Sequence, residues 1–143
     1  MAALSGACSN VMAISHQLLL TLFPGFYAIA RFAPQEKFSF DYAHSSFFSL
    51  TKTAEELSIV CGQSELPEGV RAERDRRLLR IDSKITFELT GIVASIAVPL
   101  ADAGISIFAV SSFDTDYFLI SHREIEQAIM MLESAGHKVQ RSS

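Results

Sequence analysis

Two short groups of residues in the second half of the chain have the types and spacing to hold a small polar ligand. The first is Thr90-Gly91-Ile92, which stands where apolar spacing predicts the start of a helix, so its backbone N–H groups would be free to bind a carboxylate. Gly91 would also let a ligand approach the backbone closely. The second is the run from Ser111 to Asp116, whose hydroxyl, carboxylate and main-chain oxygens could accept hydrogen bonds from an ammonium group. Together they match the needs of an amino acid.

Each group also has a purely structural interpretation. Gly91 could serve only the packing of the helix, and the aspartates could serve only a turn, in which Asp commonly hydrogen-bonds its own backbone. Asp114 and Asp116 could be paired carboxylates for acid–base chemistry, but no second group with a catalytic role stands near them. We therefore expect binding or a turn here rather than catalysis.

The sequence contains none of the common catalytic or cofactor motifs. It lacks a Gly-rich phosphate loop, a His-Glu-x-x-His motif, a nucleophile elbow and a paired-cysteine metal site. The histidines and cysteines are scattered along the chain: His16, His44, His122 and His137, with Cys8 and Cys61. We expect no metal site, no cofactor and no disulfide.

Composition describes a folded protein with no electrostatic preference for nucleic acid. Of its 143 residues 49% are hydrophobic, and the formal net charge is −4, whereas nucleic-acid binding needs a basic face. Five arginines fall between Arg71 and Arg80, but Glu73 and Asp75 interrupt them, so we interpret the segment as a solvated loop that runs into an edge strand. The first thirty residues contain no Lys or Arg, which argues against a secretory signal and favours a cytoplasmic protein without a membrane span.

The second half predicts a regular alternation of elements. A helix runs from Thr90, a candidate N-cap, to Gly104, with a kink or an early end at Pro99 because proline has no N–H to donate. A strand over 105–110, apolar on nearly every position and therefore buried, forms a hairpin with a strand over 117–120. A second helix begins with a capping box, Ser121 to Glu124, and ends near Gly136 before a closing strand.

The first half is shorter and more broken. We expect a loose tail over 1–15, then a hairpin of two strands over 16–21 and 26–32 that turns at Phe23-Pro24-Gly25. A strand over 47–50 and another over 57–61 flank a single helical turn at Thr53 to Glu56. The composition of 62–69 is that of a linker, so the domain organisation is a first unit over 16–66 and a second over 67–143.

From Leu78 onward the predicted order is β, α, β, β, α, β. This order is the ferredoxin-like plan, in which helices cover one face of an antiparallel sheet. The fold class is therefore α+β, with two such units of which the first is abbreviated.

At these residues the sequence resembles the ACT-domain family. The resemblance rests on Leu89-Thr90-Gly91-Ile92, on the run from Pro99 to Phe108, and on Ser112-Phe113-Asp114-Thr115-Asp116-Tyr117. Within the family the chain is similar to the CASTOR-like branch of small proteins with two ACT units, which are related to the regulatory part of aspartate kinase. The runs 47–51 and 56–61 resemble the first unit of that branch, and the likeness covers about 18–139.

The resemblance implies a regulatory module that senses an amino acid at the interface of two units and has no catalysis of its own. Carried over by motif, the strand of one unit is matched by Ser58, Ile59 and Val60, the helix start of the other by Leu89, Gly91 and Ile92, and its hairpin loop by Ser112, Phe113 and Asp116, which enclose Asp114 and Thr115. In CASTOR-like relatives an aspartate at the position of Asp116 faces a cationic ligand side chain.

Two questions stay open from the sequence. The animal sensor has four units and this chain two, so the site could be complete within one chain or only across a homodimer, and the bound state would pass to that second copy or to a regulated partner. The alternative function is a non-catalytic interaction or dimerisation protein without a ligand, in which 114–116 is only a turn.

Overall fold

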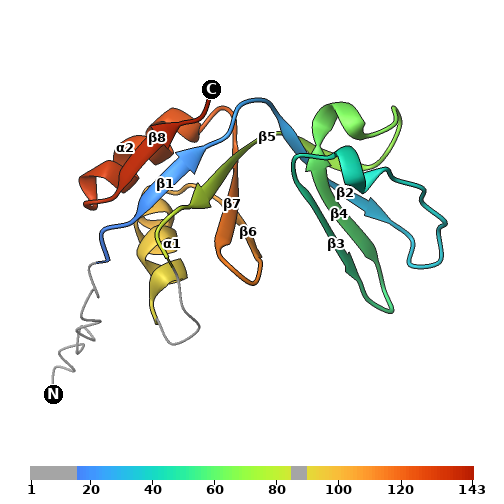
Figure 1. Ribbon diagram of the computed structural model, residues 1–143, viewed down its shortest axis with the longest axis horizontal. Helices are drawn as coiled ribbons and strands as arrows, with labels where there is room; N and C mark the ends of the chain where they lie inside the picture. The colour runs from blue at the N-terminus through green and yellow to red at the C-terminus, as the bar shows by residue number, and fades with distance from the viewer. Residues whose placement is uncertain (1–15, 85–89) are drawn as a thin grey trace, which may run out of the picture.

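A computed structural model describes residues 16–84 and 90–143, and Figure 1 shows the arrangement of its elements. The strands are β1 (Leu19–Leu22), β2 (Tyr27–Phe32), β3 (Phe48–Lys52), β4 (Leu57–Gly62), β5 (Ala72–Ile81), β6 (Phe108–Ser111), β7 (Asp116–Ser121) and β8 (Lys138–Arg141). The helices are α1 (Ile92–Asp102) and α2 (Ile125–Ser134), and two 3₁₀ turns are η1 (Tyr42–His44) and η2 (Gln63–Glu65). The predicted α+β class is confirmed.

All eight strands belong to one sheet, and β5 joins its two parts. The first half of β5 pairs with β2, which continues through β4 to β3, whereas its second half pairs with β1 on one edge and β7 on the other. The arginine-rich segment is therefore a central strand, and the prediction of a solvated loop leading to an edge strand was wrong. Along β5 the charged residues alternate between exposed acidic side chains and partly buried arginines, so the segment is not a fully solvated surface.

The predicted hairpin of the first two strands is also wrong. β1 and β2 do not pair with each other but lie one after the other along the same edge of β5, with Leu22 opposite Leu79 and Tyr27 opposite Arg76. The residues that connect β1 to β2, 23–26, form a bend at this edge, and Gly25 within it has a positive φ of 82°. A Pro-Gly pair signals a local bend, but which strand accepts the hydrogen bonds on either side depends on residues far away in the sequence.

A β-bulge at Asp75 marks the point where β5 passes from one part of the sheet to the other. Asp75 has a φ of 55°, and the register of β5 against β2 shifts there. Its backbone N–H donates to the Gln63 side chain at 2.6 Å, and its carbonyl accepts from the N–H of His122 at 2.8 Å. The bulge is therefore held by residues from both parts of the chain.

The second part has the predicted order β5-α1-β6-β7-α2-β8, with β1 inserted between β5 and β8. Both helices cover one face of this sheet (Figure 1), and their apolar stripes bury Ile96 and Leu100 of α1 and Leu132 of α2 against Leu79 and Phe118. The ends of both helices agree with prediction: Gly104 and Gly136 take positive φ, and each helix closes with the paired bonds of a Schellman motif.

Three local predictions in this part need correction. The N-cap of α1 is Gly91 rather than Thr90, and α1 continues past Pro99 without ending. The helix α2 begins at Ile125, because Ser121 is the last residue of β7 and so cannot act as its capping residue. Strand β6 begins only at Phe108 and lies at a sheet edge, so it is largely exposed rather than buried.

One buried histidine explains why α1 tolerates Pro99. Proline leaves the carbonyl of Ser95 without its helical donor, and Nε2 of His137 lies 3.0 Å from that oxygen. The other ring nitrogen, Nδ1, accepts a hydrogen bond from the N–H of Leu18 at 3.1 Å. These partners assign the neutral tautomer with the proton on Nε2. His137 thus connects α1 with the start of β1.

The first part of the fold is a strand layer covered by a long connection. Its core contains Phe32, Leu57, Ile59 and Cys61, and the segment between β2 and β3 packs aromatic side chains against that core. The predicted helical turn at Thr53 is instead the turn of the β3–β4 hairpin, where the Thr53 hydroxyl accepts the N–H of Glu56 at 3.1 Å. No helix in the described part of the chain has the length and apolar character needed to cross a membrane.

Candidate functional site

The turn between β6 and β7 is an ordered polar loop. The backbone N–H and the hydroxyl of Ser112 both donate to the carbonyl of Thr115 at 2.9 Å. Ser111 donates its hydroxyl to Oδ1 of Asp116 at 2.5 Å, and the Thr115 hydroxyl donates to the carbonyl of Ile81 at 2.6 Å. The loop is therefore tied back to the end of β5, and Asp116 itself is partly buried.

The remaining two loop residues are exposed. Asp114 and Phe113 extend toward solvent, and the Phe113 side chain is 82% exposed. An aromatic ring in this position could contact a ligand or a partner protein that binds at the tip of the hairpin.

The start of α1 leaves its first backbone N–H groups without partners inside the helix, and one predicted residue there lies outside the described residues. Gly91 adopts a φ of 78°, a left-handed conformation that favours glycine, and its carbonyl accepts the first helical bond from Ser95. The Ile92 side chain is buried in the core, so only its backbone N–H could contact a ligand. Leu89 is the predicted residue that is not described.

On β4 the three predicted residues divide between two faces. Ile59 is fully buried inside the first part of the sheet and cannot touch a ligand with its side chain. Val60 lies on the opposite face, and the partly buried Ser58 shares that face because residues two apart on a strand point the same way.

An apolar cluster joins β4 to the β6–β7 hairpin within the same chain. Val60 packs with Tyr27, Leu78 and Leu119, and the partly buried Val110 and Tyr117 pack against this group. We call these residues the inter-unit cluster. Figure 1 shows the β3–β4 and β6–β7 hairpins extending in the same direction from the crossing of β2 and β5. The cluster therefore brings the face of Ser58 and Val60 toward the strands that carry the polar loop.

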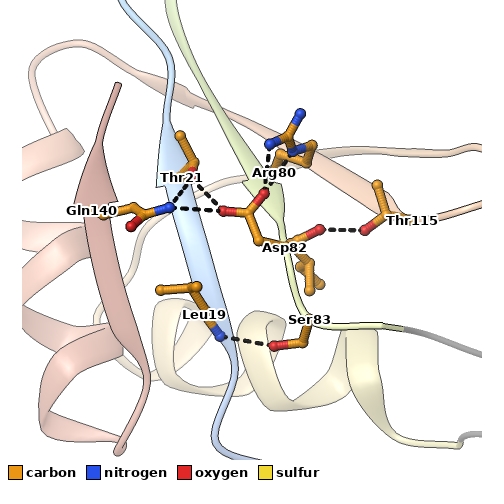
Figure 2. Close-up of polar contacts among 8 residues, drawn as sticks. Leu19, Thr21, Arg80, Asp82, Ser83, Thr115 and Gln140 are labelled. Carbon is orange, nitrogen blue, oxygen red and sulfur yellow. Dashed lines mark hydrogen bonds and ion pairs between the residues drawn. The ribbon is translucent and has the colours of Figure 1, made fainter. Parts of the chain in front are cut away.

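A polar network that sequence reasoning missed lies on the face of the sheet opposite α1 and α2 (Figure 2). Its centre is Asp82: Oδ1 accepts from Nε of Arg80 at 2.7 Å, and Oδ2 accepts from the hydroxyl of Thr21. Gln140 donates to the Thr21 oxygen at 2.9 Å, and the Arg80 guanidinium lies over the Phe23 ring at 4.9 Å. The available signal was Arg80-x-Asp82, since alternate residues of a strand share a face.

This network reaches the predicted loop. Figure 2 shows Thr115 beside the end of β5, next to Asp82, where its hydroxyl donates to the Ile81 carbonyl. On the other side of Asp82, the Ser83 hydroxyl accepts the N–H of Leu19 at 3.0 Å, which connects the end of β5 to β1. The polar loop, the end of β5 and β1 therefore form one connected structure.

Cys61 is the one thiol in the described residues, and its environment makes it a poor nucleophile. Burial, with a smaller contribution from the nearby Glu65 carboxylate, raises the pKa of the Cys61 thiol to about 11. The thiol therefore stays protonated near neutral pH, and the thiolate needed for nucleophilic chemistry is scarce. Among residues 16–84 and 90–143, no group of three or more His, Cys, Asp or Glu side chains is placed to bind a metal ion.

The fold and these residues define a known class of domain. Residues 71–134 match the family model of the ACT domain, and residues 25–69 match a second model, which describes an N-terminal domain. Residues 71–134 therefore form an ACT domain, as the resemblance predicted. This family consists of regulatory ligand-binding domains.

Its relatives include a human protein and several bacterial ones. The human protein CASTOR3P is 31% identical over 101 residues, an alignment that covers 62% of each protein, so the chain spans less than two thirds of that relative. The crystal structure of protein Atu0741 from Agrobacterium tumefaciens is 34% identical, covers 90% of this chain and 96% of its own, and has a TM-score of 0.82. The regulatory subunit of aspartate kinase from Thermus thermophilus shares the fold at 11% identity, a TM-score of 0.59 and coverage of 81% and 95%.

Proposed function

We propose that this protein is a regulatory module that binds an amino acid between its two units. The observation that carries the proposal is the inter-unit cluster, in which Val60 of β4 packs with Leu119 of β7 inside one chain. Both halves of the predicted site, the strand and the polar hairpin, then belong to the same molecule. A ligand held between them would contact both units at once.

The proposed roles follow the chemistry of a zwitterion. The ligand carboxylate would accept from the backbone N–H groups after Gly91, where the helix leaves its first donors unpaired. The ligand ammonium or a cationic side chain would donate to Asp116, whose carboxylate is already oriented by the Ser111 hydroxyl. Ser58 would contribute a hydroxyl from the opposite unit.

Regulation would follow from the position of the site. The two units could adopt more than one relative arrangement, and a ligand that binds one arrangement more tightly stabilises it by the difference between its affinities for the arrangements. This shift in population is enough to alter an interface with another protein. The bulge at Asp75 in β5 is the point about which the units would adjust. The module needs no catalytic residue for this role.

A second copy of the chain is the proposed recipient of the signal. Among the described strands, β7 alone pairs with β6, and the Phe108 side chain of β6 is 37% exposed. The outer face of α1 also presents Val98, which is 55% exposed. An open strand edge beside exposed apolar side chains favours pairing with another protein surface. Light scattering with and without the bound amino acid tests this point.

The test of the proposal is thermal unfolding against each common amino acid. A ligand at about 100 times its Kd adds roughly 2.7 kcal/mol to the unfolding free energy, a shift of several degrees in the midpoint. Asp116→Asn should abolish the shift for a cationic amino acid, because the amide removes the negative charge but preserves shape. The control is Asp102→Asn, an exposed aspartate at the end of α1 that should leave the shift unchanged. If no amino acid raises the midpoint, or if Asp116→Asn responds like the wild type, the proposal fails.

A further inference from the structure

The segment between β2 and β3 forms a second place where a ligand could bind, remote from the polar hairpin in the chain. The Phe40 ring stacks on Phe48 with centroids 4.6 Å apart, and the Phe38 ring lies 4.7 Å from that of Phe32. Because Phe32 and Phe48 belong to strands, the aromatic rings of the connection have fixed supports. The connection between β2 and β3 is therefore held in place by packing of its aromatic side chains against the strands.

Beside these rings lies a cavity of about 310 Å³ that is open to solvent. Its lining combines the rings of Phe38 and Phe40 with the carboxylates of Asp41 and Glu65 and the imidazole of His44. The lining contains no lysine or arginine. Its size is at the lower end of the range for small-molecule sites, so it suits a compact ligand.

Glu65 is oriented before any ligand arrives. Its Oε2 atom accepts the backbone N–H of Gly62 at 2.9 Å and the hydroxyl of Ser45 at 3.0 Å, which leaves Oε1 able to accept from a ligand. A Cβ atom at position 62 would lie 2.7 Å from Oε2, so the glycine allows this close approach of carboxylate and backbone. Asp41 is similarly engaged through Oδ2, which lies 2.6 Å from Nδ1 of His44.

We propose that this cavity binds a small organic cation, an amine or guanidine compound that carries no carboxylate. Carboxylates form charge-assisted hydrogen bonds with ammonium and guanidinium groups, and aromatic faces attract the same cations. A free amino acid fits poorly, because Asp41 and Glu65 repel its α-carboxylate, no lysine or arginine lines the cavity to receive it, and the His44 imidazole is already paired with Asp41. The site is therefore different in ligand and in place from the amino-acid site at Asp116.

Isothermal titration of the full chain with agmatine, the decarboxylated form of arginine, tests the proposal. Glu65→Gln and Asp41→Asn should each weaken agmatine binding at least about tenfold. Glutamine keeps an acceptor oxygen for Gly62 and Ser45, so the loop should stay folded, and an unchanged thermal midpoint verifies this. The matched control is Glu55→Gln, an exposed carboxylate in the β3–β4 turn, for which affinity should not change.

Two further titrations separate this site from the proposed amino-acid site. In the Asp116→Asn protein agmatine should bind as in the wild type, and arginine should bind at least about tenfold more weakly than agmatine. Lack of agmatine binding at about 10 mM, or equal binding by Glu65→Gln, Asp41→Asn and wild type, overturns the cavity proposal. Loss of agmatine binding in Asp116→Asn also overturns it, because the cation then occupies the amino-acid site, which would itself remain supported.

Discussion

Replacing His137 by alanine should destabilise the protein strongly, and the cost should shrink once Pro99 is also replaced. The imidazole is only 6% exposed and connects two backbone groups, the N–H of Leu18 at 3.1 Å and the carbonyl of Ser95 at 3.0 Å. That carbonyl needs an external donor only because residue 99 is a proline. Removing the ring leaves both groups without a hydrogen-bond partner inside the fold.

The expected magnitude follows from those two groups. Each buried polar group left unsatisfied costs about 1–3 kcal/mol, so His137→Ala should lower the unfolding free energy by about 2–6 kcal/mol. In the Pro99→Ala protein the new N–H at position 99 can bond the Ser95 carbonyl within the helix. Loss of His137 then leaves only the Leu18 N–H unpaired, and the cost should fall to about 1–3 kcal/mol. The coupling between the two substitutions is thus about 1–3 kcal/mol.

Urea denaturation of the wild type, both single variants and the double variant, followed by circular dichroism, measures this coupling. His122→Ala is the control for loss of a histidine, because His122 is exposed and its ring lies edge-to-face with Phe26 at a centroid distance of 4.9 Å, an aromatic contact that contributes about 0.5–1.5 kcal/mol. If His137→Ala costs the same in both backgrounds, within about 0.5 kcal/mol, the bond to Ser95 contributes nothing and the reasoning is refuted.

Two further predictions concern Cys61 and Asp75. Because burial raises the pKa of the Cys61 thiol from about 9 to about 11, the unfolded chain loses this proton first. The stabilising contribution is then complete below about pH 9 and is lost as pH rises toward 11, by roughly 2–3 kcal/mol. Urea denaturation of wild type and Cys61→Val across this range should show that difference, and parallel curves would contradict it. At Asp75, where φ is 55°, Asp75→Val should cost about 1–3 kcal/mol more than Asp75→Gly in the same assay, because a β-branched residue resists positive φ. Equal stabilities would show that the bulge relaxes.

Sequence alone determined the features whose signals are local. Gly104 and Gly136 end their helices because only a residue that accepts positive φ can close a Schellman motif. The buried stripe of α2 and the hairpin of β6 and β7 likewise follow from patterns within a few residues. The motif runs from Leu89 to Tyr117 were also specific enough to identify the ACT-domain family, which the comparisons confirm.

The sequence predicted on which elements the candidate residues lie, but not the directions of their side chains. Ile59 and Ile92 occupy the predicted strand and helix start, yet both side chains are buried in apolar cores. Whether a strand residue faces a core or a ligand depends on which sheet face the neighbouring unit covers, and a motif carries no such information. That Ser58, Gly91 and Asp116 bind one ligand stays a prediction.

Only the tertiary structure decided how distant segments meet. Strands β1 and β2 lie along one edge of β5, and Leu20 pairs with Ile81 although about sixty residues separate them in sequence. The same is true of His137 with Ser95, and of Gln140 with Thr21. Sequence patterns report the preferences of residues within one turn of helix or one hairpin. The long-range contacts form instead because burying the apolar faces of several elements together is favourable. Two of these long-range contacts, His137 with Ser95 and Gln140 with Thr21, therefore have no signature in any single stretch of the chain.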